Sequence, residues 1–130
     1  MSRILAVDPG DARIGLAISD ETGIIARPLL VIEHRSRQQD AEAILRVAHE
    51  NSAREIVVGV AYDSVGNPGP QARKALRLAQ ALREAGSEIV HVWDESGSTL
   101  AAQQVRRSPH DLDARAAAVI LQDFLDAKTG

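Results

Sequence analysis

The sequence of 130 residues contains no cysteine and very few aromatic residues, with one tryptophan, one tyrosine and one phenylalanine. Without cysteine the chain can form no disulfide, no thiolate metal site and no cysteine nucleophile. A core with so few aromatic rings must be built from aliphatic side chains. The lack of cysteine also fits a reducing compartment, so we expect a cytoplasmic protein.

Long apolar runs and an excess of positive charge are also missing. No stretch approaches the roughly 18 apolar residues that a membrane-spanning helix requires, and Asp8 interrupts the N-terminal apolar run too early for a signal peptide. We therefore expect no membrane partner. The formal net charge is −3, so binding to nucleic acid would need a local basic patch or bridging cations.

The length of the chain is that of one domain, which we expect to span residues 1–130. Alternating or continuous apolar runs bounded by turn residues predict five strands, near residues 3–8, 12–19, 24–33, 55–60 and 88–93. Helical spacing predicts four helices, near residues 38–50, from 72 to a stop at Gly86, and at 99–107 and 109–127. This order predicts an α/β fold with a five-stranded mixed sheet, an antiparallel meander followed by parallel strands, flanked by helices.

Three acidic residues occupy positions where a strand ends or a helix faces the sheet. Asp8 lies at the end of the first predicted strand, and Glu95 follows the fifth. Asp113 shares a helical stripe with the apolar residues four, seven and eleven positions later, which is the face expected against the sheet. Carboxylates gathered there would repel one another unless divalent cations neutralised them, and hard oxygen ligands suit Mg²⁺ or Mn²⁺. Two such ions can support phosphodiester hydrolysis.

Each of these acids also has a purely structural interpretation. Asp8 begins an ordinary Asp-Pro-Gly turn, Glu95 enters a loop, and Asp113 could complement the dipole of its helix. The combined placement of the three, and not any one of them, favours a metal site.

Further residues are candidates for contacts with a substrate. Gly15 would let the substrate or the neighbouring strand approach closely, although a glycine in a strand is often only a bulge. Arg13 could reach a phosphate, although a solvated arginine at a strand edge is the more common case. The remaining cations near the acids in the sequence are Arg106, Arg107 and Arg115.

Five segments of the chain, in the right order, resemble the YqgF/RuvX family. They are DPGDARIGLAISD at residues 8–20 and the shorter segments 56–60, 69–72, 93–95 and 113–125. Members of this family are described as Holliday-junction resolvases and as nucleases that mature the small-subunit ribosomal RNA precursor. The resemblance implies a ribonuclease-H-like fold and an acidic, metal-binding triad at Asp8, Glu95 and Asp113.

The chain departs from the family pattern around this triad. After Glu95 the family usually continues with Arg-Leu-Thr-Ser or similar, whereas this chain has Ser96-Gly97-Ser98-Thr99. Ala61 and Asp63 occupy places where the family usually carries a proline and an asparagine. The stretch from Glu95 to Asp113 is shorter than usual, and the missing part is normally rich in lysine and arginine. These losses predict a weaker electrostatic grip on a nucleic-acid backbone.

The leading expectation is a nuclease that depends on Mg²⁺ or Mn²⁺ and acts on structured RNA or branched DNA. It would mature the 5′ end of pre-16S rRNA or resolve branched DNA. The alternative is a nucleic-acid or ribosome-precursor binding protein of the same fold with weakened hydrolysis. A third class, the actin-like or sugar-kinase-like phosphotransferases, needs a second lobe for which 130 residues leave no room. Both a monomer and a homodimer are compatible with the sequence.

Overall fold

The computed structural model of the chain describes residues 3–86, 89–95 and 109–129. The strands are β1 (Arg3–Pro9), β2 (Arg13–Ser19), β3 (Ala26–Glu33), β4 (Ala53–Val60) and β5 (Ile89–Asp94). The helices are α1 (Arg37–Glu50), α2 (Pro70–Glu84) and α3 (Pro109–Thr129). The predicted helix near residues 99–107 lies outside the described residues.

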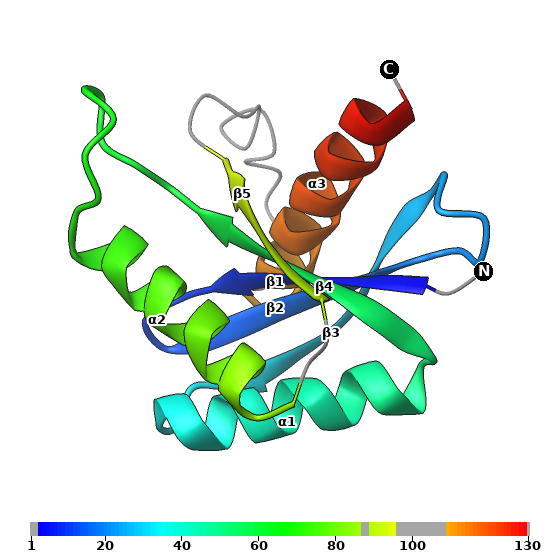
Figure 1. The fold of residues 1–130 in the computed structure, drawn as a ribbon, viewed down its shortest axis with the longest axis horizontal. Helices are drawn as coiled ribbons and strands as arrows, with labels where there is room; N and C mark the ends of the chain where they lie inside the picture. Colours follow the sequence, from blue (N-terminus) through cyan, green and yellow to red (C-terminus); the bar gives the residue numbers. More distant parts are fainter. Residues whose placement is uncertain (1–2, 87–88, 96–108, 130) are drawn as a thin grey trace.

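The five strands form one sheet in the order β3-β2-β1-β4-β5 (Figure 1). The pairs β1–β2 and β2–β3 are antiparallel, whereas β1–β4 and β4–β5 are parallel. The short turns after β1 and β2 allow only antiparallel neighbours, and the helices α1 and α2 provide the crossovers that parallel pairing requires. The predicted mixed sheet is therefore confirmed, and β1 stands where its antiparallel and parallel halves meet.

Both faces of the sheet are covered, by α1 and α2 on one face and by α3 on the other (Figure 1). In β1, Leu5 and Val7 belong to the core cluster shared with α1 and α2, while Ile4 and Ala6 pack with α3. A strand buried on both sides explains the continuous apolar run of the sequence. By the same alternation, Asp8 falls on the face that α3 covers.

The helix ends follow the local signals in the sequence. Ser36 caps α1, its side-chain oxygen accepting the backbone N–H of Gln39. Helix α2 begins at Pro70, and Gly86, just beyond its end, has φ of 115°, a left-handed conformation that glycine adopts without strain. Helix α3 begins at Pro109, as predicted. No described helix is long and apolar enough to cross a membrane.

Candidate active site

The site begins with Asp8, which lies near the carboxyl end of the central strand β1. Its partner in β2 is Gly15. On the other side, Val7 is in register with Val58 of β4, so that Asp8 comes level with Gly59. The carboxylate therefore stands between two strands that carry a glycine, and thus no side chain, beside it.

Gly15 is needed because helix α3 approaches the sheet at this point. A Cβ atom on residue 15 would overlap the backbone carbonyl oxygen of Asp113. We expected Gly15 to admit a substrate or a neighbouring strand, and the structure instead brings the backbone of α3 against it. The glycine thus positions Asp113 over the end of β1 and β2.

Gly59 has the corresponding role on the other side of Asp8. A Cβ atom there would lie 2.5 Å from Oε2 of Glu95 and 2.5 Å from Cδ1 of Ile120. The missing side chain leaves space for the Glu95 carboxylate beneath α3. Gly59 was not among the predicted site residues, although a glycine inside the apolar run Ile56–Val60 is a signal of close approach.

Burial and neighbouring charge act together on Asp8. Desolvation, followed by the negative charges of Glu95 and Asp113, raises the pKa of Asp8 from 3.8 to about 7. The two other acids are therefore close enough for their charges to be felt at Asp8. A carboxyl group with such a pKa is about half protonated at neutral pH, which marks this end of the sheet as a candidate functional site.

Glu95 follows β5 directly and is held by the sheet. Its backbone N–H donates to the carbonyl oxygen of Val60 over 2.9 Å. Burial raises the pKa of its carboxyl group, and the charge of Asp94 adds to this. Its Oε2 atom is buried and has no hydrogen-bond partner among the residues that the structure describes. Such an unsatisfied oxygen is costly, and a bound cation would satisfy it.

Asp113 is held differently, by Arg13 of β2. The Nε atom of Arg13 donates to Oδ2 of Asp113 over 2.7 Å, and about a third of each side chain is exposed. Arg13 therefore contacts an acid of the site, where we had expected a phosphate contact or a solvated side chain. The last helix presents Asp113 on the predicted stripe, since Ala117, Ile120 and Phe124 are all buried.

The three acids of the site offer donor atoms that suit a hard divalent cation. The described side chains are not, however, grouped around one point where an ion could bind. Asp8, Glu95 and Asp113 offer only carboxylate oxygens, the ligands preferred by Mg²⁺ and Mn²⁺. Among residues 3–86, 89–95 and 109–129, however, no three histidine, aspartate or glutamate side chains are grouped so that they could hold a metal ion. One reason is that the carboxylate of Asp113 is paired with Arg13.

The other basic candidates contribute less to the described site. Arg115 lies two residues beyond Asp113 in α3, which places it on a different side of the helix. It forms no hydrogen bond or ion pair with a described residue. Arg106 and Arg107 lie outside the described residues.

Known proteins similar to this chain cover almost its whole length. The model of the RuvX family, described as Holliday junction resolvase, matches residues 2–127. A protein of Thermoanaerobacter pseudethanolicus named "Putative pre-16S rRNA nuclease" is 37% identical, over 97% of this chain and 97% of its own length. A protein of the same name from Anaeromyxobacter sp. (strain Fw109-5) is 40% identical, over 97% of this chain and 98% of its own.

Among solved structures, RuvC of T. thermophilus in complex with a Holliday junction substrate superposes with a TM-score of 0.60 at 19% sequence identity. The match covers 100% of this chain and 97% of that one. At this identity the similarity concerns the fold, and it confirms the predicted ribonuclease-H-like architecture.

Proposed function

The chain belongs to the RuvX family, and from this membership and the geometry of its acidic site we propose that it is a nuclease that hydrolyses phosphodiester bonds. Asp8, Glu95 and Asp113 are the proposed catalytic residues. One observation carries the proposal: the two glycines beside Asp8 admit the backbone of Asp113 on one side and the carboxylate of Glu95 on the other. Burial and the charges of these two acids accordingly raise the pKa of Asp8. A structural ion pair would lower the pKa of a carboxyl group, whereas this site concentrates negative charge in a desolvated place.

The same three residues would hold the Mg²⁺ or Mn²⁺ ions of the proposed enzyme. Such ions supply an activated water and stabilise the leaving oxygen of a phosphodiester. The protein contributes the buried end of β1, which carries Asp8, and the space that Gly15 and Gly59 leave beside it. Arg13 holds the carboxylate of Asp113 by an ion pair of 2.7 Å.

The proposed substrate is structured RNA or branched DNA. Relatives at 37% and 40% identity carry a name that refers to pre-16S rRNA, and the family description refers to Holliday junctions. We therefore propose either maturation of the 5′ end of pre-16S rRNA or resolution of branched DNA, in the cytoplasm, by a monomer or a homodimer.

A second candidate function is binding of nucleic acid or of a ribosome precursor with weakened hydrolysis. Two observations favour it. No described group of three side chains is ready to hold an ion, and the residue after Glu95 is Ser96, where the family usually has arginine.

Cleavage assays separate these two functions. A pre-16S rRNA fragment and a four-way DNA junction are incubated with the protein in Mg²⁺, Mn²⁺ or EDTA. We expect cleavage of one substrate with metal, and a loss of about a hundredfold or more in Asp8→Asn, because charge stabilisation in active sites is commonly worth that much. Glu42→Gln, an exposed change on α1, is the control. Metal-independent binding of both substrates without cleavage would establish the second function instead.

A further inference from the structure

A second pocket lies at the same end of the sheet as the acidic site, but on the opposite face. It has a volume of about 380 Å³ and is formed by the turn after β1, the start of α1 and one side of α2. Ile14 and Leu78 are among its lining residues, and both belong to the core between the sheet and the helices α1 and α2. Pro9 and Gly10, the two residues after Asp8, separate it from the acidic site.

The charged lining of this pocket is mainly positive. It contains Arg37, Lys74 and Arg77 together with one carboxylate, that of Asp40. The chain as a whole has a net charge of −3, so the local excess of cations contrasts with the overall composition. Arg37 and Arg77 form no side-chain hydrogen bond or ion pair with a described residue. Their guanidinium groups are therefore free to donate to a ligand in the pocket.

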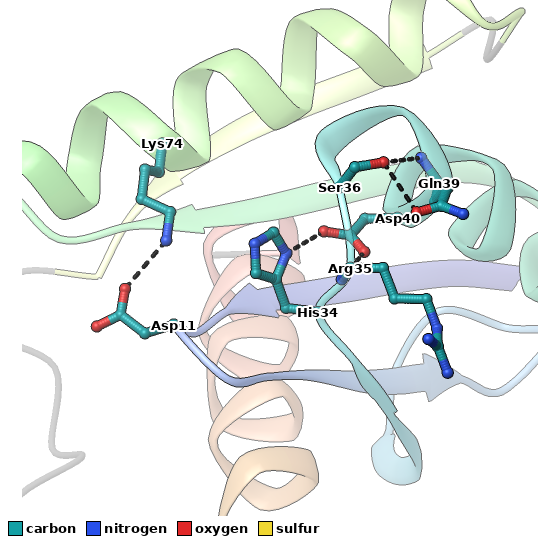
Figure 2. Close-up of polar contacts among 7 residues, drawn as sticks. All are labelled: Asp11, His34, Arg35, Ser36, Gln39, Asp40 and Lys74. Atoms are coloured by element: carbon teal, nitrogen blue, oxygen red, sulfur yellow. Dashed lines mark hydrogen bonds and ion pairs between the residues drawn. The ribbon is translucent and has the colours of Figure 1, made fainter.

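The carboxylate of Asp40 is already occupied by the protein. Its Oδ2 lies 2.5 Å from Nδ1 of His34, and its Oδ1 accepts the backbone N–H of Arg35 over 3.0 Å (Figure 2). Asp40 is only 4% exposed. Both oxygens are thus engaged in holding the segment that enters α1, and Asp40 fixes the ring of His34 as one wall of the pocket. It is a structural acid, and it pairs with neither Arg37 nor Arg77.

Lys74 is placed near the turn after β1 by a second contact. Its Nζ lies 3.0 Å from Oδ1 of Asp11 (Figure 2). Gln71 donates to Oδ2 of the same carboxylate over 2.7 Å. The hydrogen bond from Lys74 is the largest cause that lowers the pKa of Asp11, so this carboxylate is ionised at neutral pH. The contact ties α2 to the turn that follows Asp8, and so connects the pocket to the acidic site.

From this arrangement we propose that the pocket binds a phosphate group, and that the group belongs to the backbone of a nucleic-acid strand. Guanidinium groups form paired hydrogen bonds with phosphate, and an ammonium group adds a point charge. The volume accommodates a phosphate with its sugar. A strand that passes over Pro9 and Gly10 would place one phosphate at the acidic site and another in this pocket. The assignment of the phosphate to a nucleic-acid strand rests on the proposed function. The binding of a phosphate group does not, because it is argued from the cationic lining of the pocket.

The test measures binding without hydrolysis. Fluorescence anisotropy of a short labelled single-stranded RNA and of a labelled four-way DNA junction is recorded in EDTA over a series of salt concentrations. The variant Arg37→Gln/Arg77→Gln removes the two free guanidinium groups. Arg46→Gln, an exposed arginine of α1 outside the pocket, is the matched control. Melting temperatures verify that each variant is folded.

We expect the double variant to bind at least one of the two nucleic acids about tenfold or more weakly, and the slope of log K against log salt to fall by about two. Arg46→Gln should bind within about twofold of the parent protein, because it lies outside the contact. Inorganic phosphate and adenosine monophosphate, titrated calorimetrically, test the alternative source of the phosphate group. Binding of these small ligands that depends on the two arginines, with unchanged binding of RNA and DNA, would overturn the assignment to a strand. Equal binding of every ligand by the double variant and the parent would overturn the proposal that this pocket binds a phosphate group.

The same proteins separate this proposal from the proposed function. If the parent protein cleaves nothing with Mg²⁺ or Mn²⁺, but its binding of RNA or DNA in EDTA depends on Arg37 and Arg77, the nuclease proposal fails and the pocket proposal stands. If Asp8→Asn abolishes cleavage while the double variant changes neither binding nor its salt dependence, the pocket proposal fails and the nuclease stands.

Discussion

At the end of the sheet that carries Asp8, each face holds acidic side chains that are at least partly buried, and the two faces differ in whether the protein satisfies them. On the face of α1 and α2, Asp40 has both oxygens engaged, by His34 and by the N–H of Arg35. On the face of α3, Oε2 of Glu95 has no partner within the described part of the chain, and Asp8 has its pKa raised to about 7. Burial alone therefore does not distinguish an acid proposed to be functional from a structural one. The distinction lies in the unsatisfied oxygen and the uncompensated charge, which cost stability unless a ligand supplies the partner.

The largest expected effect comes from adding a side chain at Gly15, where the backbone of α3 lies against the sheet. Gly15→Ala would place a Cβ into the carbonyl of Asp113, and a backbone atom cannot move aside as a side chain can. We expect a loss of about 3 kcal/mol in the free energy of unfolding, at the upper end for overpacking, measured by urea denaturation. Gly69→Ala is the control, because no atom lies within 4 Å of a Cβ there. Equal stability of the two variants would show that α3 does not pack as described.

The second effect concerns pH and has an unusual sign. The pKa of Asp8 is raised from 3.8 to about 7 in the folded state, so the folded state binds more protons than the unfolded state between these values. Without metal, stability should therefore fall as pH rises from about 4 through 7. Asp8→Asn should remove this slope. The full shift of about three pKa units corresponds to about 4 kcal/mol, and solvent screening of this partly exposed group reduces the expected stabilisation of the metal-free protein at pH 8 to about 2–3 kcal/mol.

Melting temperatures of the parent and of Asp8→Asn in EDTA between pH 5 and pH 8 measure this effect. Added Mg²⁺ or Mn²⁺ should restore stability to the parent and not to the variant. A parent protein that becomes more stable as pH rises would show that Asp8 has a compensating partner.

The third effect concerns Asp40, where removal of the carboxylate should lower the stability, the opposite of the result expected for Asp8→Asn. Asp40→Ala leaves the N–H of Arg35 and the ring of His34 without their acceptor, and we expect a loss of about 2 kcal/mol in the free energy of unfolding. Chemical denaturation at neutral pH is the measurement. A stabilising effect of Asp40→Ala, like the one expected for Asp8→Asn, would remove the contrast between the two faces.

The smallest effect concerns Arg13, whose ion pair with Asp113 is about one-third exposed on both sides. Such a pair contributes about 1 kcal/mol or less, so Arg13→Gln should change the melting temperature only slightly. Loss of the positive charge beside the acids should strengthen Mn²⁺ binding, measured by paramagnetic relaxation of water protons. Weaker Mn²⁺ binding would mean that Arg13 is needed to hold Asp113 in a metal-binding position.

The secondary structure could be predicted because its signals are local. The alternation around Leu5 and Val7 and the helical stripe of Asp113 are properties of short segments, and so are the proline and glycine at helix ends. The order of these segments limited the topology to a mixed sheet, because short turns cannot join parallel strands. The positions of Asp8 and Glu95 at strand ends followed from the same reasoning.

Contacts between distant segments were decided only by the tertiary structure. Arg13 and Asp113 are separated by 100 positions, and no periodicity relates a strand residue to a carboxylate on the last helix. Gly59 acquires its importance only when Glu95 packs beside it. The cationic pocket likewise joins Arg37 of α1 to Arg77 of α2, two exposed arginines with nothing unusual in their own segments.

By itself the sequence determined which residues face the sheet and where its strands end, since both depend on the repeat of the local backbone. Which acids meet, and which remain unsatisfied, depended on how closely α3 packs against two glycines, a property of side-chain volumes brought together from across the chain.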